Sequence, residues 1–170
     1  MRFQDIKKFT RDGHYRIDVS WDYVGKWVDS HTDVDIQLNP DFQRAHVWTE
    51  NQQRAFVEFV LRGGTGSKEL RFNCVGWMQD WKGPMVLVDG KQRLKAVQKF
   101  MRNDLKVFGH KFSDFEDDMD MLVASFSIRV NDLPTRADVL QWYLDINGGG
   151  VVHTDEELDK VKKMLDEEKE

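Results

Sequence analysis

The chain has 170 residues, 40% of them hydrophobic and 32% charged, a composition typical of one folded domain rather than a disordered polymer. Its apolar runs are too short for a transmembrane helix, and the N-terminus lacks the apolar core of a secretion signal. The single cysteine, Cys74, cannot form an internal disulfide. We therefore expect a cytoplasmic protein that makes no membrane contact.

The formal charge of −5 is distributed unevenly along the chain. Residues 155–170 contain eight acidic and four basic residues and so hold most of the negative charge. Residues 89–111 instead contain seven lysines and arginines but only two aspartates. This distribution argues against non-specific coating of DNA and leaves room for one local anion-binding site.

The N-terminal part of the chain predicts a strand and a short helix. Ile17 and Val19 alternate with polar residues, which is a weak strand pattern. Ser20 is placed to cap a helix that follows directly. One face of that helix would carry Trp21, Val24, Trp27 and Val28.

A second helix is predicted after the turn sequence Asn39-Pro40-Asp41. Thr49 and Gln52 match the capping-box pattern, and Gly63-Gly64 would end the helix. Its apolar stripe would be Phe56, Phe59 and Val60.

Two strands and a third helix are expected next. Residues 72–78 and 84–88 are apolar enough for strands, and Gly90 breaks the second one. A helix of about three turns should begin directly after Gly90, because apolar residues recur there at helical spacing. These are Leu94, Val97 and Met101.

The C-terminal part predicts one strand and two helices. Phe126, Ile128 and Val130 alternate with polar residues, which predicts a strand with one buried face. Thr135 would cap a helix that buries Val139, Trp142, Tyr143 and Ile146, with Asn147-Gly148-Gly149-Gly150 as its stop. Thr154 and Glu157 would cap a last helix that carries Leu158, Val161 and Leu165.

Because helices and strands mix without strict alternation, the fold class should be α+β. We expect a single domain over residues 1–170, a small mixed sheet packed with helices, with a frayed acidic helical segment at about residues 154–170.

The most informative segment is Asp89-Gly90-Lys91-Gln92-Arg93, where a buried strand meets a helix. The first-turn N–H groups of a helix lack intrahelical acceptors, and the helix dipole favours an anion there. Gly90 lets the backbone approach a ligand closely, and Arg93 can hold phosphate oxygens with two donors. Asp89 could hold a divalent metal, a ribose hydroxyl or Arg93. The alternative is structural: Asp89 caps the helix while Lys91 and Arg93 are solvated.

A second segment, Asn39-Pro40-Asp41-Phe42-Gln43-Arg44, precedes Trp48 and the capped helix. Gln43 and Arg44 could contact a base or a phosphate, whereas Phe42 and Trp48 are more typical of core residues than of stacking platforms. Arg44 could equally pair with Asp41 or Asp89.

Three segments in this order resemble the N-terminal domain of GmrSD-type modification-dependent restriction enzymes, within the ParB/sulfiredoxin-like superfamily. That family has a P-x-F-Q-R-x-x-V-W segment, a D-G-Q-Q-R-L segment and an R-L-N-x-G-G segment. The chain matches them at residues 40–48, 89–94 and 145–150, and the resemblance spans about residues 15–160.

The resemblance implies a nucleotide- or phosphate-binding site, with NTP hydrolysis that controls a separate nuclease domain in restriction relatives. The implied phosphate-binding residues are Gln43, Arg44, Gly90, Lys91, Gln92, Arg93, Asn147, Gly148 and Gly149. Asp89, Arg93 and Arg44 would be catalytic. Asp89 or Asn147 would ligate Mg²⁺, which uses few protein ligands.

This sequence departs from the family pattern at two places. Lys91 replaces the first glutamine of D-G-Q-Q-R, and the arginine of the third segment is absent from Leu144-Asp145-Ile146-Asn147. The loss of a phosphate ligand argues against hydrolysis. The short chain suits a phage or mobile-element protein of restriction or anti-restriction systems.

Two other functions stay open at this point. The chain could be a non-catalytic interaction protein that keeps the fold and binds a protein partner or DNA. It could also be a ParB-like DNA nuclease, although its five histidines form no metal or nuclease motif. The clustered acids Asp114, Glu116, Asp117, Asp118 and Asp120 have the adjacent spacing of a solvated loop.

Overall fold

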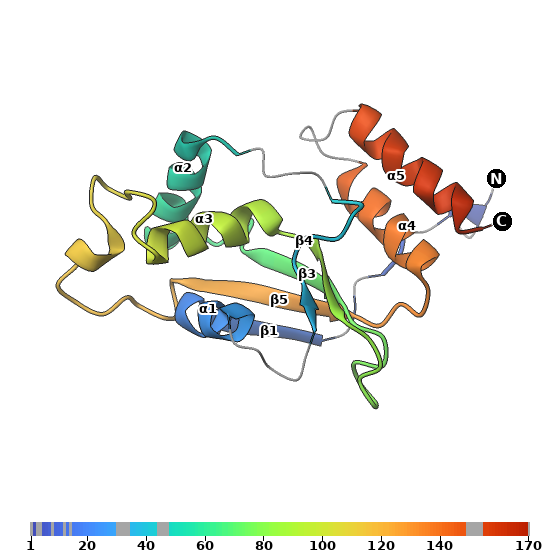
Figure 1. Cartoon of the computed structure of the whole chain (residues 1–170), viewed down its shortest axis with the longest axis horizontal. Helices are drawn as coiled ribbons and strands as arrows, with labels where there is room; N and C mark the ends of the chain where they lie inside the picture. Colours follow the sequence, from blue (N-terminus) through green and yellow to red (C-terminus); the bar gives the residue numbers. More distant parts are fainter. Residues whose placement is uncertain are drawn as a thin grey trace.

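The computed structural model describes residues 2, 5–7, 9–11, 13, 15–29, 35–43, 48–148 and 155–169. Within these residues, a mixed five-stranded sheet has the order β1-β5-β3-β4-β2, which confirms the α+β class (Figure 1). The strands are β1 Tyr15–Ser20, β2 Ile36–Gln37, β3 Glu69–Asn73, β4 Met85–Asp89 and β5 Ser125–Asn131. The helices are α1 Trp21–Asp29, α2 Glu50–Leu61, α3 Lys91–Met101, α4 Arg136–Asn147 and α5 Asp155–Glu167, with a short 3₁₀ helix η2 at Phe112–Asp114.

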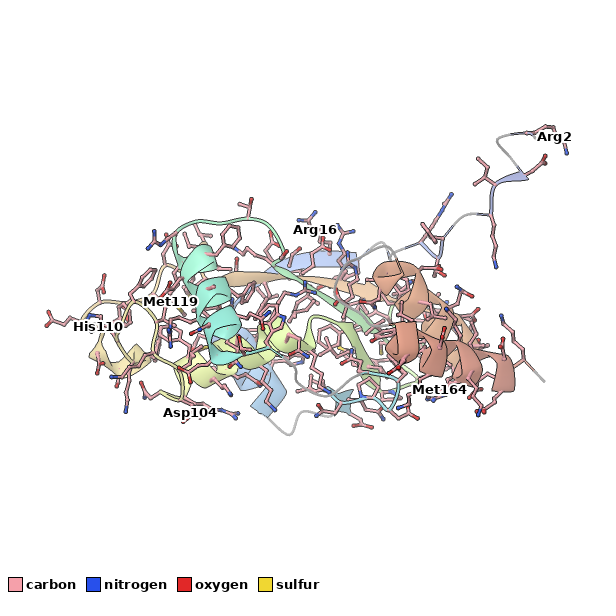
Figure 2. The ribbon with its side chains drawn as sticks, turned by 90° about the horizontal axis from the view of Figure 1, so that it is seen from above. Arg2, Arg16, Asp104, His110, Met119 and Met164 are labelled. Carbon is pink, nitrogen blue, oxygen red and sulfur yellow. The ribbon has the colours of Figure 1, made fainter. Side chains whose placement is uncertain are left out.

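The sheet combines parallel and antiparallel pairs. β5 pairs with β1 antiparallel and with β3 parallel, and β4 pairs with β3 antiparallel and with β2 parallel. The η2 region, near His110 and Met119, and α5, near Met164, lie toward opposite ends of the molecule (Figure 2). No helix in the described ranges is long and apolar enough to cross a membrane.

The predicted caps are present where the structure describes them. The Ser20 hydroxyl accepts a hydrogen bond from the Tyr23 backbone at 3.4 Å, at the start of α1. Thr49 forms the capping box of α2 with Gln52, and the Thr135 hydroxyl accepts from the Asp138 backbone in α4. Thr154, a predicted cap of α5, lies outside the described residues, as do the side chains of Glu157 and Val28.

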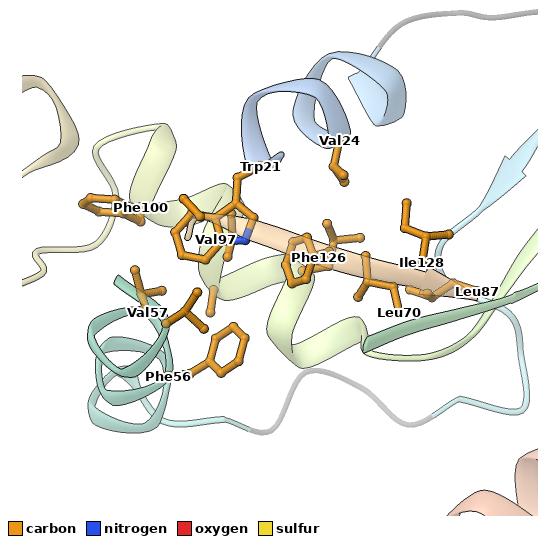
Figure 3. Close-up of a cluster of buried hydrophobic side chains, with 14 of the residues drawn as sticks. Trp21, Val24, Phe56, Val57, Leu70, Leu87, Val97, Phe100, Phe126 and Ile128 are labelled. Atoms are coloured by element: carbon orange, nitrogen blue, oxygen red, sulfur yellow. The ribbon is translucent and has the colours of Figure 1, made fainter. Parts of the chain in front are cut away.

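The main core fills the space between one face of the sheet and helices α1, α2 and α3. Phe126 of β5 and Leu70 of β3 face Trp21 of α1 and Val97 of α3, and all four side chains are buried (Figure 3). Val57 packs there from α2. Burial of this kind stabilises by about 1.5–3 kcal/mol for each large aliphatic side chain, and it fixes α3 against the sheet.

A second core joins α4 and α5 to β4. Val161 and Leu165 of α5 are buried against Trp142 and Tyr143 of α4, and Val88 of β4 belongs to the same cluster. The expectation of a frayed C-terminal segment was therefore wrong for residues 155–167. The physical reason is that the apolar stripe on α5 packs against apolar side chains of α4.

The strand predicted over residues 72–78 is shorter and begins earlier, at Glu69. The chain turns after Cys74, because Gly76 has a φ of +73° and the turn brings Trp81 onto Trp77. Apolar composition misled the prediction, since Trp77 and Met78 belong to this turn.

The prediction of one buried face on β5 was incomplete. Most of its polar residues are buried as well, including Ser125, Ser127 and Asn131. β5 lies between β1 and β3 in the sheet, and the Arg16 guanidinium donates to the Ser127 hydroxyl at 2.9 Å. A long side chain from the neighbouring strand therefore covers that face.

Candidate functional site

The turn between β4 and α3 requires glycine at position 90. Gly90 has a φ of +103°, and a Cβ atom there would lie 2.5 Å from a Leu70 methyl carbon and 3.0 Å from the Glu69 carbonyl oxygen. α3 begins at the next residue, Lys91, so the predicted strand-to-helix turn is confirmed. Gly90 is itself the N-cap, with no side-chain hydrogen bond, so Asp89 does not cap the helix.

This turn faces a cleft with a volume of about 620 Å³. α2 and the loop after it form one wall, the β4–α3 turn forms the floor, and the end of α4 forms the other wall. The described lining residues are Gln43, Trp48, Phe56, Phe59, Ser67, Arg71, Val88, Asp89, Gly90, Lys91, Gln92, Arg93, Tyr143, Ile146 and Asn147.

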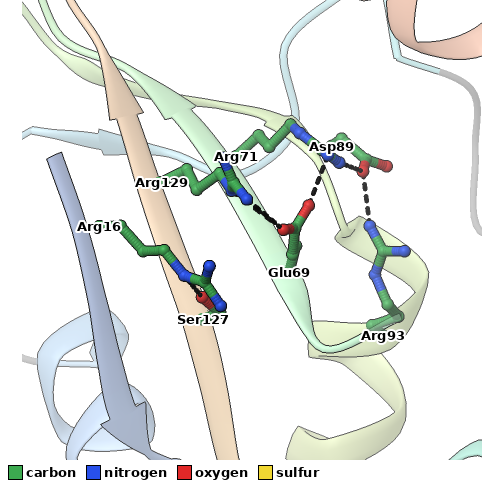
Figure 4. A network of polar contacts seen from close by, with 7 residues as sticks. All are labelled: Arg16, Glu69, Arg71, Asp89, Arg93, Ser127 and Arg129. Atoms are coloured by element: carbon green, nitrogen blue, oxygen red, sulfur yellow. Dashed lines mark hydrogen bonds and ion pairs between the residues drawn. The ribbon is translucent and has the colours of Figure 1, made fainter. Parts of the chain in front are cut away.

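Asp89 is the centre of an ion-pair network in this cleft. Its Oδ2 atom accepts from Arg93 Nη2 at 2.6 Å and from Arg71 Nη1 at 2.9 Å (Figure 4). The Arg93 side chain is 17% exposed, so the alternative that it is solvated was wrong. Of the three roles considered for Asp89, the structure shows the pairing with Arg93.

The network continues across the sheet through Glu69. Arg71 also pairs with Glu69, which accepts in turn from Arg129 Nε at 2.9 Å. The strand register explains this row, because Arg16 lies opposite Arg129, Arg129 opposite Arg71, and Arg71 opposite Asp89. Arginines directly opposite one another repel, and the two carboxylates offset that repulsion.

The two motif glutamines, Gln43 and Gln92, hold the wall of the cleft together. Gln43 Nε2 donates to the Leu87 carbonyl oxygen at 2.7 Å, and Gln92 Oε1 accepts from the Trp48 backbone at 3.2 Å. Within the part of the chain that the structure describes, the Gln43 Oε1 atom is buried without a hydrogen-bond partner, although it belongs to a residue that lines the cleft. A ligand that donates a hydrogen bond would satisfy it.

The aromatic residues divide between core and cleft. Phe42 is buried against Tyr143, with ring centroids 5.3 Å apart, as expected for a core residue. Trp48 is half-buried, packs on Phe56 and also lines the cleft. Phe59 was expected in the apolar stripe of α2, but it is 48% exposed and lines the cleft instead.

The third motif reaches the cleft through Asn147. Its Nδ2 atom donates to the Tyr143 carbonyl oxygen at 2.8 Å, at the end of α4. Gly148 follows the helix but does not line the cleft. Arg44 and Gly149 lie outside the described residues, so their predicted roles stay predictions.

The cleft is electropositive within its described lining. Arg71, Lys91 and Arg93 carry positive charge there, and Asp89 is the single acid among those lining residues. Burial lowers the pKa of Lys91, and the nearby Lys95 ammonium lowers it further. Both effects disfavour the charged lysine, so an anion beside Lys91 would relieve them.

Arg71 is the functional candidate that the sequence prediction missed. Leu70 and Phe72 face the main core, so Arg71 between them must point to the opposite face of the sheet. This alternation was present in the sequence, but the strand was placed three residues too late to include it.

The remaining candidate groups lie apart from the cleft. The acids between Asp114 and Asp120 are exposed, as expected for a solvated loop. Cys74 is fully buried, and burial raises the pKa of its thiol. The described residues contain no group of three or more histidine, cysteine or acidic side chains that could hold a metal ion.

Comparison with known protein families gives a match over most of the chain. A family model described as "GmrSD restriction endonuclease, N-terminal domain" matches residues 24–167. No curated protein and no solved structure matches this sequence.

Proposed function

We propose a function from one premise: this chain belongs to the family of GmrSD restriction endonuclease N-terminal domains. That membership associates the chain with restriction. Within this setting, we propose that the cleft beside Asp89 to Arg93 binds the phosphate groups of a nucleoside triphosphate. The observation that carries the proposal is the convergence of a helix N-terminus, three cationic side chains and Asn147 on one cleft of about 620 Å³.

Phosphate binding would proceed by exchange of partners. Arg93 and Arg71 both donate to the same Asp89 oxygen, and both guanidinium groups line the cleft. A phosphate group that enters would compete with Asp89 for these donors, and guanidinium is well suited to bidentate phosphate contacts. Lys91 adds a third charge beside the backbone of Gly90. By the family resemblance, Arg44 would add a further positive charge for the phosphates.

The chain's own residues also supply ligands for Mg²⁺. Arg71 and Arg93 both bind the Oδ2 atom of Asp89, so the Oδ1 atom of the same carboxylate is the proposed metal ligand. Asn147 donates a hydrogen bond through its side-chain nitrogen, so its amide oxygen is the second proposed ligand. Two guanidinium groups at Asp89 disfavour a lone cation, so we propose that Mg²⁺ enters with the nucleotide phosphates. Mg²⁺ would supply charge neutralisation of the phosphates, and Asp89 with Arg93 and Arg44 would orient them for hydrolysis.

A nucleotide titration of two variants tests the proposal. Arg93→Ala removes a charge-assisted contact of about 1.5–3 kcal/mol, so NTP affinity should fall about ten- to a hundredfold. Lys91→Gln is the matched control, because it restores the family residue and should cost less. Labelled NTPs are titrated with and without Mg²⁺, and thermal unfolding of each variant verifies that it is folded.

Two results would make us abandon nucleotide binding. One is a wild-type protein that binds no NTP at millimolar concentration. The other is an Arg93→Ala variant that is folded and binds as well as wild type.

One observation favours a second candidate, a non-catalytic interaction protein. The η2 end carries a separate apolar groove of about 590 Å³, lined in part by Phe108, Phe112 and Phe115. Next to it, Met121 is 62% exposed and Leu122 is 88% exposed. Exposed apolar surface of this kind is typical of protein contacts. Wild-type protein that fails the nucleotide titration would leave this candidate as the better one.

A further inference from the structure

We infer that the outer face of α3 is a contact surface for the phosphate backbone of a DNA duplex. This surface consists of Lys91, Lys95, Lys99 and Arg102, and we call it the α3 basic stripe. The choice of DNA rests on the restriction association under the proposed function. The stripe begins at the edge of the nucleotide cleft with Lys91 and extends away from it, and duplex binding is measured without nucleotide.

The charge of α3 is unlike that of the other helices. α3 contains four basic residues and no acidic residue, and Arg102 follows it as the C-cap. The four other α-helices described each contain more acidic than basic residues. Positive charge is therefore concentrated on one element of a chain whose formal charge is −5.

Helical geometry aligns this charge on one side. With 3.6 residues per turn, Lys91, Lys95, Lys99 and Arg102 fall within an arc of about 80°. Leu94, Val97 and Phe100 face the main core from the other side of the helix. Arg93 also points away from the stripe, toward Asp89. The Lys95 ammonium is close enough to Lys91 to lower its pKa, which agrees with the two side chains lying on the same side of the helix.

The stripe is only partly exposed: Lys95 and Arg102 are exposed, whereas Lys91 and Lys99 are half-buried. α3 runs between α1 and α2 in front of the sheet (Figure 1). The carboxylates of Asp22 on α1 and Glu50 on α2 are already paired, with Lys26 and Arg54 of their own helices. Asp104 lies just past the end of the stripe and limits its length.

The dimensions of the stripe suit a nucleic-acid backbone. Lys91 and Arg102 are separated by about 16 Å along the helix axis, and a DNA strand carries one charge per about 3.4 Å of duplex axis. A helix lying along one strand could therefore contact about four phosphates. Contacts of this type supply affinity without sequence specificity.

A charge-reversal experiment tests this surface. The Lys95→Glu/Lys99→Glu variant changes the stripe without changing a residue that lines the cleft. The matched control is Lys162→Glu/Lys163→Glu on α5, which makes the same change in net charge at another exposed site. Binding of a fluorescent random-sequence duplex is measured by anisotropy as a function of salt concentration.

We expect the α3 variant to lose at least tenfold in duplex affinity at low salt while the α5 control loses less than threefold. Wild type should show a slope of log affinity against log salt near −3.6, for about four contacts, and the α3 variant should lose about two contacts. A neutral Lys95→Gln/Lys99→Gln variant should show an intermediate loss, which keeps the test valid if the charge reversal disturbs folding.

Three results would overturn the inference. The first is an equal loss of duplex affinity in the α3 and α5 variants. The second is a wild-type protein that does not bind the duplex at about 100 µM and low salt, conditions under which non-specific DNA binding is observed. The third is a folded α3 variant whose slope of log affinity against log salt equals that of wild type. NTP binding is measured on the same proteins. NTP binding by the wild-type protein separates failure of this surface from failure of the nucleotide site, because neither Lys95 nor Lys99 lines the cleft.

Discussion

At the scale of single residues, Asp89 has an environment that changes its expected role. A carboxylate proposed as a metal ligand or catalytic group accepts from two guanidinium groups at 2.6 and 2.9 Å. These are the same groups that would bind phosphate. Under the proposed function, Asp89 would therefore compete with the phosphate for Arg93 and Arg71.

Substitution of Asp89 by Asn tests this competition. Asn keeps the shape and one acceptor but removes the negative charge, so NTP binding without Mg²⁺ should become several-fold tighter. The unfolding free energy should fall by about 1–3 kcal/mol, because two partly buried guanidinium groups lose a charged partner. Isothermal titration and urea denaturation measure the two effects.

The conservative control is Asp89→Glu, which keeps the charge and should not tighten binding. Weaker Mg²⁺-free binding by a folded Asp89→Asn variant would show instead that Asp89 holds Arg93 in its binding position. A loss of Mg²⁺-dependent affinity confined to Asp89→Asn would support the role of Asp89 as a metal ligand.

At the scale of secondary-structure elements, local signals predicted helices better than strands. Ser20, Thr49 and Thr135 each precede a helix that they cap, because a capping hydrogen bond depends only on residues within one turn. The predicted strand at residues 72–78 failed because the pairing of β3 with β4 and β5 depends on residues distant in sequence.

The parts of the candidate site that depend on local sequence were likewise predicted better than those that depend on distant residues. The turn at Gly90 was predictable, since a buried strand, a glycine and a periodic helix follow one another in the sequence. The position of Arg71 was not predicted, because its approach to Asp89 depends on the register between β3 and β4. The approach of Asn147 followed only from the family resemblance.

The docking of α5 on α4 gives a prediction at this scale. Leu165 is 5% exposed and belongs to the cluster that joins the two helices. Leu165→Ala should lower the unfolding free energy by about 2–5 kcal/mol, through lost burial and the cavity left behind. Lys163→Ala on the exposed side of α5 is the control, with an expected effect within about 0.5 kcal/mol.

Chemical denaturation measures these energies, and hydrogen exchange locates the effect. Amides of α5 should lose protection in Leu165→Ala while those of β3, in the centre of the sheet, lose less. Equal stability of Leu165→Ala and wild type would show that α5 does not contribute to the fold.

At the scale of the whole molecule, charge and apolar surface are distributed among separate places. The cleft lies between α2, the β4–α3 turn and α4, and the α3 basic stripe begins at its edge with Lys91. The apolar groove lies at the η2 end of the molecule, away from α5 (Figure 2). Three different ligands could therefore occupy the molecule without sharing a surface, apart from Lys91.

The same distribution bears on the third alternative, a DNA nuclease. Metal-dependent cleavage needs carboxylates that converge on a metal beside the scissile phosphate. Asp89 is the single acid among the described lining residues of the cleft, and Arg71 and Arg93 already engage it. The exposed acids between Asp114 and Asp120 lie at the η2 end, where the described residues include no metal-binding group. We therefore expect the chain to bind DNA without cutting it.

Incubation of the purified chain with plasmid DNA and Mg²⁺ or Mn²⁺ should leave the plasmid supercoiled, with or without NTP. Contaminating nucleases are the main source of false activity, so an Asp89→Asn preparation is assayed in parallel. Equal traces of cleavage in the two preparations would indicate contamination. Strong metal-dependent cleavage by wild type that Asp89→Asn abolishes would contradict the prediction and make this cleft a nuclease centre. In that case Arg93 and Arg71 would bind the scissile phosphate instead of a nucleotide.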